Sequence, residues 1–310
     1  MARKSIQFGL EVFTLESSDG RVRASVVPSL GATVSSLVLP GIGGVPRESL
    51  HRRPWFWDRD AGETRGGIPP LFPICGRLLD DDGVPGRYRL GNASFSLPIH
   101  GFAMRMPWRV VDSAKPDALR LALASTFESR AAYPFAFELE LVFRVAPHGF
   151  SCMLVVANVG TEPLPYAAGF HPYFATPPAG YGKEQTCFYV DATARRFYDG
   201  TKTAVVDSGS PPEFPMSVAA PEVNGLLLDA APSGESRIVF PDSTEIRIHA
   251  TPLFRFRQFY TQPDQPFFCD EAWMAPPNAL NRLGCARILL PDQSETSTLR
   301  ISRFVPGTNG

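Results

Sequence analysis

The sequence lacks the features that would place the chain in a membrane or on a nucleic acid. The longest apolar runs among its 310 residues are far shorter than the about 18 residues that a membrane-spanning helix needs. The start, Met-Ala-Arg-Lys-Ser-Ile-Gln, has basic residues but no apolar segment after them, so we predict no signal peptide and a cytoplasmic protein. The 30 basic and 31 acidic residues leave a net charge of −1, without the basic surplus that general nucleic-acid binding requires. We expect neither a nucleic acid nor a membrane as partner.

The chain also lacks the signatures of disulfide, metal and nucleotide sites. Its five cysteines are odd in number, and no two are spaced as Cys-x-x-Cys. In a reducing compartment we expect them to be mainly small buried side chains. There is no Walker loop, no Gly-x-Gly-x-x-Gly after a strand, no His-Glu-x-x-His and no Gly-x-Ser-x-Gly elbow. We therefore predict no cofactor and no metal.

Abundant proline and alternating hydrophobicity indicate strands. The 31 prolines are spread along the chain and leave little room for long helices. Apolar residues alternate with mostly polar ones through residues 135–145, and residues 150–158 follow after the turn Pro147-His148-Gly149. Similar alternation recurs in both halves of the chain, without a linker between them. We predict an all-β protein, with residues 1–310 forming a single large antiparallel sandwich or barrel domain.

Polar residues interrupt dense Gly/Pro/aromatic sequence in two histidine-containing segments. His100 lies in Leu97–Trp108, and His171 lies in Pro165–Phe174. A single histidine in such a setting is commonly a core residue with satisfied hydrogen bonds. Here two of the chain's five histidines lie in such a setting, which favours a role for them in the site. Imidazole titrates near neutral pH and is therefore suited to proton transfer.

Two further segments carry charge after apolar sequence. Arg77 ends the run that begins at Arg65, and it needs a partner, either a structural carboxylate or a ligand, because an unpaired buried guanidinium is costly. Asp270 and Glu271 follow an apolar strand, where they could also be a solvated strand end. Neighbours on a strand point to opposite faces, so only one of the two can enter a given pocket. This argues against a glycosidase that uses both carboxylates.

Together these segments resemble the aldose 1-epimerase family of the galactose mutarotase-like superfamily. The resemblance rests on stretches that occur in the family's order and span about two thirds of the chain: Gly66-Gly67-Ile68-Pro69 through Gly76-Arg77, His100-Gly101-Phe102-Ala103, Gly169 to Phe174, Glu271-Ala272-Trp273, and Pro277 to Asn281. The set is most similar to a bacterial branch beside the hexose-6-phosphate epimerases. It implies a single-domain β-sandwich that isomerises a sugar in a cleft on one concave sheet.

The resemblance also implies roles for individual residues. Glu271 corresponds to the general base that takes the proton of the anomeric hydroxyl, and His171 to the general acid that protonates the ring oxygen. His100 corresponds to a second histidine near the ring oxygen, and Arg77 to an arginine that binds sugar hydroxyls. Asn224 stands, in a looser alignment, where the family often has an aspartate before an apolar run.

This mechanism sets expectations for the site. The ring opens, the C1–C2 bond rotates, and closure on the other face inverts C1, with acid and base expected on opposite sides of the anomeric centre. The pKa of Glu271 should be raised by an apolar pocket, for which Phe267, Phe268 and Trp273 are candidates. Trp273 or Trp108 could stack on the sugar.

Three departures from the family pattern bear on substrate and base. Met104 stands where the family usually has an arginine, with Arg105 one place later, so we predict a preference for unphosphorylated sugars unless Arg65 or Arg105 compensates. Asn224 leaves the hydroxyl specificity open. Asp270 replaces an apolar residue beside the base, and Asp270→Asn should change activity little if its side chain points away from the cleft.

Residues 51–59 interleave basic and aromatic side chains, a pattern that also occurs on nucleic-acid and membrane surfaces. With a net charge of −1 we expect a loop at the cleft rim or a partner surface instead. The functional alternatives are a hexose-6-phosphate 1-epimerase and, in another class, a non-catalytic sugar-binding or regulatory protein on the same fold. The sequence leaves the oligomeric state open.

Overall fold

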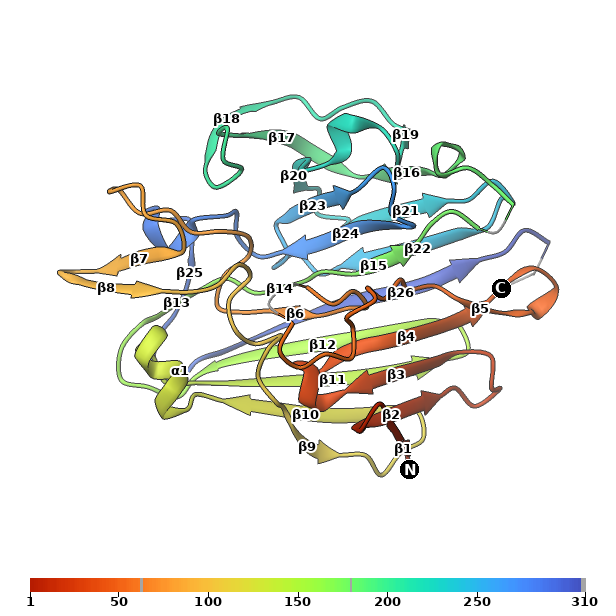
Figure 1. Cartoon of the computed structure of the whole chain (residues 1–310), viewed down its shortest axis with the longest axis horizontal. Helices are drawn as coiled ribbons and strands as arrows, with labels where there is room; N and C mark the ends of the chain where they lie inside the picture. The colour runs from red at the N-terminus through yellow and green to blue at the C-terminus, as the bar shows by residue number, and fades with distance from the viewer. Residues whose placement is uncertain (62–63, 179, 308–310) are drawn as a thin grey trace.

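Antiparallel strands make up most of the computed structural model, which describes residues 1–61, 64–178 and 180–307 (Figure 1). The predicted all-β sandwich class is therefore confirmed. One layer is a nine-stranded sheet. Its strands, in spatial order, are β19 (Met216–Ser217), β16 (Cys187–Val190), β21 (Glu235–Val239), β22 (Glu245–Ala250), β26 (Ser294–Phe304), β12 (Gly149–Asn158), β11 (Phe137–Ala146), β10 (Ala118–Ala124) and β9 (Arg109–Asp112).

Two sheets form the opposing layer. The eight-stranded sheet contains, in order, β18 (Val205–Gly209), β17 (Ala192–Tyr198), β20 (Leu227–Ala230), β23 (Phe256–Thr261), β24 (Phe267–Trp273), β14 (Gly169–Phe170) and β6 (Pro70–Leu71), with β15 (Tyr173–Ala175) also paired to β24. The five-stranded sheet contains β1 (Arg3–Gln7), β2 (Leu10–Glu16), β3 (Arg23–Val27), β4 (Thr33–Pro40) and β5 (Pro46–Glu48). Single bridges between Val34 and Ile68 and between Leu50 and Phe174 connect the two sheets.

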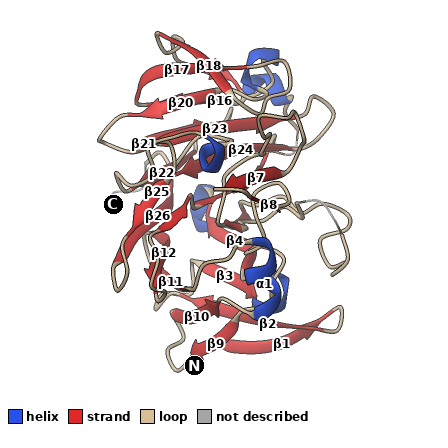
Figure 2. Ribbon diagram, turned by 90° about the vertical axis from the view of Figure 1, so that its left-hand side faces the viewer, coloured by secondary structure: helices blue, strands red, loops and turns tan. Residues whose placement is uncertain are grey.

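The remaining elements are short (Figure 2). Two hairpin-sized sheets pair β7 (Arg87–Leu90) with β8 (Ala93–Ser96) and β13 (Leu164–Tyr166) with β25 (Arg287–Leu289). The α-helix α1 (Phe127–Ala132) is capped by Thr126, whose hydroxyl accepts from the Ser129 amide. The 3-10 turns are η1 (Pro28–Leu30), η2 (Ile42–Gly44), η3 (Lys183–Gln185), η4 (Pro221–Val223) and η5 (Ala279–Asn281).

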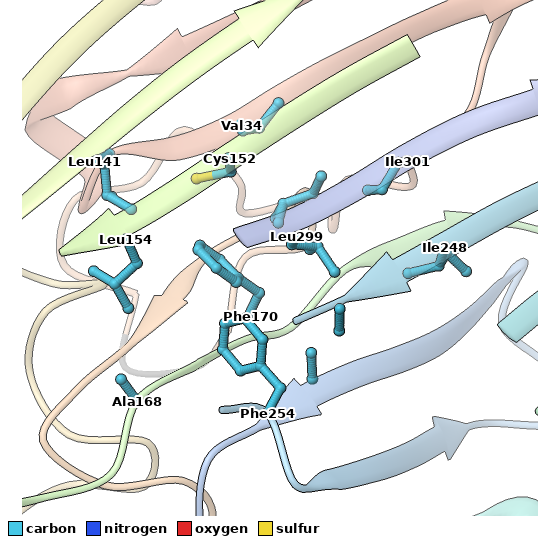
Figure 3. Packing of buried hydrophobic residues seen from close by; sticks show 14 of the residues in the cluster. Val34, Leu141, Cys152, Leu154, Ala168, Phe170, Ile248, Phe254, Leu299 and Ile301 are labelled. Atoms are coloured by element: carbon cyan, nitrogen blue, oxygen red, sulfur yellow. The ribbon is translucent and has the colours of Figure 1, made fainter. Parts of the chain in front are cut away.

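The core lies between the two layers. Figure 3 shows Leu141, Leu154 and Leu299 from the nine-stranded sheet packed with Phe170 and Phe254. At the other end, Phe188 on β16 meets Phe259 and Phe268 on β23 and β24, with ring centres 4.8 and 4.9 Å apart. The eight-stranded sheet, which carries the site described below, is therefore held from behind by aromatic packing.

The hairpin β11–β12 forms where alternation predicts it. Phe137, Leu139 and Leu141 are buried, whereas Glu138 between them is exposed. Ala146 pairs with Gly149, so Pro147 and His148 make the turn. The cysteines are free, and three of the five are buried. Within the described ranges, no helix combines the length and the apolar character needed to cross a membrane.

Candidate active site

Strand β24 separates two adjacent carboxylates. Its odd-numbered residues face one side of the sheet and its even-numbered residues face the sandwich interior. Glu271 and Trp273 accordingly line a cleft, whereas Phe268 belongs to the main core. Asp270 points inward with Phe268, so Glu271 is the residue of the pair that enters the cleft.

The cleft has a volume of about 770 Å³ and is built around strands β23 and β24. It brings together all five side chains that the sequence suggested: His171, Glu271, His100, Arg77 and Asn224 line it. Its other walls are supplied by Arg53, Trp55, Thr64, Gly76, Ile99, Tyr173, Tyr198, Lys202, Gly225, Gln258, Tyr260, Gln262, Trp273 and Pro277.

Glu271 and His171 are in direct contact at the base of this cleft. Nε2 of His171 lies 3.3 Å from Oε1 of Glu271, and both side chains are at most 5% exposed. The other oxygen, Oε2, accepts a hydrogen bond of 3.0 Å from the Trp273 indole N–H. Trp273 thus fixes the carboxyl group and leaves Oε1 facing the imidazole and the cleft.

His171 is placed by its neighbours on both sides. Phe170 precedes it, points into the core and packs against Phe254 (Figure 3). The His171 ring stacks on Tyr173 with centres 4.6 Å apart and planes 7° from parallel. Nδ1 of His171 has no hydrogen-bond partner among the described residues, so Nε2 is the nitrogen that the site uses.

His100 is held by a tight turn. Its φ is 63° and that of Gly101 is 72°. A Cβ on Gly101 would lie 2.1 Å from the Phe72 carbonyl oxygen, so only glycine fits there. The Gly76 amide donates to Nδ1 of His100 at 3.1 Å, and a neutral His100 ring therefore carries its proton on Nε2.

Burial shifts the pKa values of all three side chains toward their neutral forms. Loss of solvent raises the pKa of Glu271 well above 4.5, and the Asp270 charge adds to this, while the Trp273 hydrogen bond opposes it. Loss of solvent, with the nearby His100, lowers the pKa of His171 well below 6.5. The pKa of His100 falls to about 3 for the same reason, aided by Arg105 and Arg77. For the Glu271–His171 pair both shifts favour the state that carries one proton, with that proton on Glu271.

This predicts a bell-shaped pH profile for proton-transfer activity. The pair is active with one proton, because one member must give and the other must accept. A second proton binds only below the usual pH 6.5 of histidine, so the acid limb should lie below that value. The last proton leaves only above the usual 4.5 of glutamate, so the alkaline limb lies above it. Rates measured across pH after subtraction of buffer catalysis test this, and an acid limb centred above pH 6.5 would contradict it.

The same three side chains have the composition of a metal site. His100, His171 and Glu271 each offer one ligand atom, and these atoms lie within 4.8 Å of one another. Two histidines and a glutamate also bind catalytic zinc in other proteins. Here, however, the positive charges of Arg77 and Arg53 act on the two histidines and would repel a dication.

We therefore expect chelation to leave activity unchanged. Dialysis against EDTA, followed by assay in chelator-treated buffer, should give the same rate within error, because the proton transfer needs only the protein groups. A loss of activity that Zn²⁺ restores would show that the three residues work as a metal centre.

Asp270 is neutralised inside the sandwich. Nε of Arg257 lies 3.0 Å from Oδ1 of Asp270, and both side chains are at most 1% exposed. Ser236 donates to Oδ2 of the same carboxylate at 2.5 Å. The alternative that Asp270 or Glu271 is a solvated strand end is therefore wrong. The second negative charge beside Glu271 belongs to a buried ion pair behind the sheet.

Arg77 and Asn224 lie at the exposed rim of the cleft. No carboxylate in the described part of the chain forms an ion pair with Arg77, so the expected alternative of a structural salt bridge does not hold there. The backbone carbonyl of Asn224 accepts a hydrogen bond of 3.0 Å from Nζ of Lys202. Asn224 directly follows the 3-10 turn η4 and does not lie on a strand.

Several sequence expectations about surrounding residues are wrong. Phe268 faces the core, so of the three candidates for an apolar pocket Phe267 and Trp273 share the face of Glu271. Trp108 is buried and donates to the Ala103 carbonyl, away from the cleft. Glu271 and His171 are in direct contact with each other, and their placement on opposite sides of a sugar's anomeric centre stays a prediction.

Position 104 does not contact the cleft. Met104 is 3% exposed and packs in a side cluster with Leu71 and Trp273. Arg65 donates to the carbonyls of Asp58 and Arg59, and Arg105 donates to those of Ile99 and Gly101. Neither arginine lines the cleft, so neither compensates for a missing phosphate ligand.

Sequence reasoning missed one row of cleft residues. Gln258, Tyr260 and Gln262 follow one another at every second position along β23 and beyond its end, and all three line the cleft. Gln258 pairs directly with Glu271. Their period of two was a signal in the sequence, although only the pairing of β23 with β24 shows that they share the face of Glu271.

Comparison with known proteins agrees with this arrangement. The sequence model described as aldose 1-epimerase matches residues 12–302. The chain belongs to the aldose 1-epimerase family. Membership supports a mutarotase or epimerase role for this family member.

Solved structures and a sequence relative show the same likeness. Slr1438 from Synechocystis sp. PCC 6803 has a TM-score of 0.80 at 25% identity and covers 96% of this chain and 98% of its own. A galactose mutarotase-like protein from Clostridium acetobutylicum has a TM-score of 0.79 at 16% identity, with 98% of each chain covered. The chromosomal protein LacX of Lactococcus lactis is 28% identical over 127 residues, which is 40% of this chain and 41% of LacX. The matched region thus spans less than half of LacX.

Proposed function

We propose that this protein interconverts the α and β anomers of an aldose by opening and closing the sugar ring. The observation that carries the proposal is the 3.3 Å contact between Nε2 of His171 and Oε1 of Glu271 at the base of an open cleft. Mutarotation moves one proton from the anomeric hydroxyl and one to the ring oxygen, and these two oxygens are bonded to the same carbon. An adjacent acid and base match that chemistry.

In the proposed mechanism the pair exchanges its single proton through the sugar. The proton first passes from Glu271 to Nε2 of His171 across their 3.3 Å contact. Glu271 as carboxylate then removes the proton of the anomeric hydroxyl, and the imidazolium of His171 protonates the ring oxygen while the C1–O5 bond breaks. Rotation about C1–C2 presents the other face of the aldehyde, and the two groups reverse their roles during closure. Nε2–H of His100 is free to donate to the ring oxygen, because the Gly76 amide occupies Nδ1.

Binding of the sugar falls to the remaining walls. Arg77 and Asn224 at the rim can bind hydroxyl groups, and the Trp273 ring offers a face for the apolar side of the sugar. The five side chains that the sequence predicted come from this one chain, and a small sugar is the partner that we propose for the cleft. The hexose-6-phosphate epimerase alternative uses the same acid and base and differs only in what the walls bind.

An exchange experiment separates this enzyme from a non-catalytic sugar-binding protein. Two-dimensional exchange NMR on equilibrated aldoses, free and phosphorylated, should show anomer exchange above buffer background for at least one sugar. The same spectra with Glu271→Gln should return to background. Binding of a sugar without acceleration of its exchange in the unmodified protein would overturn the proposal in favour of the sugar-binding alternative.

A further inference from the structure

The segment 51–59, which the acid–base mechanism leaves unexplained, supplies one end of the cleft. Arg53 and Trp55 line it where β23 ends and β24 begins, close to Gln262. The guanidinium carbon of Arg53 lies 4.7 Å from the centre of the Phe267 ring and 5.4 Å from that of Trp55. Stacking between rings holds the planar group in place, with Nη1 3.4 Å from Oε1 of Gln262.

This end of the cleft has positive charge without a matching carboxylate. Lys183 lies 5.6 Å from the centre of the same Phe267 ring and donates to the carbonyls of Gln262 and Gln265. Among the described residues, neither Arg53 nor Lys183 forms an ion pair; Asp264, an exposed acid, acts on Lys183 from outside the cleft. Of the acidic side chains, only Glu271 lines the cleft in the described part of the chain, against Arg53, Arg77 and Lys202.

Two hydrogen-bond donors there lack an acceptor within the described ranges. Nε of Arg53 and Nε1 of Trp55 are both buried without a partner among the described residues. Sugar hydroxyls donate as well as accept, so a neutral sugar needs acceptors in its site. A carboxylate or phosphate only accepts, and an arginine fork suits either group.

We propose that Arg53 and Trp55 form a subsite for a negatively charged oxygen group of the substrate, so that the aldose turned over is an anionic one. The group is a carboxylate, as in a sugar acid, or a phosphate ester. The inference rests on the proposed anomer exchange and names the substrate class for it. It replaces the expectation drawn from Met104, because position 104 lies outside the cleft and the cations come from other segments.

A comparison of sugars with the same ring shape tests whether the enzyme prefers a negatively charged substrate. Rates of exchange are measured for glucose, glucuronate and glucose 6-phosphate with the full-length protein. At least one anionic sugar should have a kcat/KM about tenfold or more above that of glucose, as a charge-assisted hydrogen bond provides. Comparison of the two anionic sugars identifies carboxylate or phosphate. Equal kcat/KM for all three would overturn the inference and leave the proposed function intact, whereas no exchange of any sugar would overturn both.

A matched pair of variants tests the residue. Arg53→Gln should lower the ratio of anionic to neutral kcat/KM by about tenfold or more, mainly through KM. Arg52→Gln removes the same charge from an exposed neighbour that does not line the cleft, and should leave the ratio unchanged. An unchanged ratio in Arg53→Gln would overturn the assignment.

A measurement on the unmodified protein covers the case in which Arg53→Gln fails to fold. Sodium sulfate should inhibit exchange of the preferred anionic sugar competitively, whereas sodium chloride at equal ionic strength should not. Equal inhibition by the two salts would count against a built anion subsite.

Discussion

Glu271→Gln should lower kcat for anomer exchange by at least about 100-fold, because it removes a general acid–base group and keeps the side-chain shape. The amide can still accept from the Trp273 indole, as Oε2 does now at 3.0 Å, so the geometry of the cleft should survive. KM should change little, because the lost proton transfer acts in the transition state. Polarimetry or exchange NMR on the preferred aldose measures the effect.

The control for this variant is Glu222→Gln, which makes the same change at an exposed residue outside the cleft. It should keep full activity. A Glu271→Gln protein with the unmodified rate would show that the base is another residue.

The contact between Glu271 and His171 predicts that substitutions of the two residues are not independent. His171→Asn should cost about as much as Glu271→Gln, and the double variant should cost much less than the product of the two losses. The reason is that one proton passes between groups 3.3 Å apart, so removing either member already disables both. Independent, multiplying losses would show that the two residues serve separate steps.

Local patterns explain why the fold and the floor of the cleft could be predicted. A period of two is a property of the strand backbone itself, so it revealed β11 and β12 and also showed that Asp270 and Glu271 point apart. The dipeptide His100-Gly101 stood out because a histidine lies beside a glycine in aromatic sequence. The structure shows a tight turn there, in which only glycine fits at position 101. These signals lie within a few residues of the feature that they predict.

What could not be predicted depends on which distant strands meet. Arg257 is one of 30 basic residues, and only the pairing of β23 with β24 places it beside Asp270 behind the sheet. The same pairing brings Gln258 opposite Glu271. Met104 follows a recognised motif, yet a turn of the chain buries it away from the cleft. The basic and aromatic pattern of residues 51–59 suggested a loop at the cleft rim, but it did not show that Arg53 and Trp55 are the members that line the cleft. Substrate specificity depends on such contacts, and so the sequence left it open.

Asp270→Asn should destabilise the protein by about 3–5 kcal/mol, because it leaves the fully buried Arg257 without its counter-ion. The hydroxyl of Ser236 hydrogen-bonds to both Asp270 and Arg257. The amide of an asparagine at position 270 has no negative charge to balance the guanidinium of Arg257. Urea unfolding of the variant and the unmodified protein gives the difference in free energy. The fraction that remains folded should keep its kcat within a few-fold, since Asp270 points away from the cleft.

Replacing both members of the pair tests why the loss occurs. Asp270→Leu combined with Arg257→Met puts apolar side chains of similar size behind the base, and buried ion pairs replaced in this way commonly keep or gain stability. We therefore expect the double variant to recover most of the free energy that Asp270→Asn loses. If the double variant is instead as unstable as the single one, the ion pair fixes the packing of β23 on β24 by more than its charge balance. If Asp270→Asn lowers kcat as far as Glu271→Gln does, the proposed mechanism assigns the proton acceptor to the wrong residue.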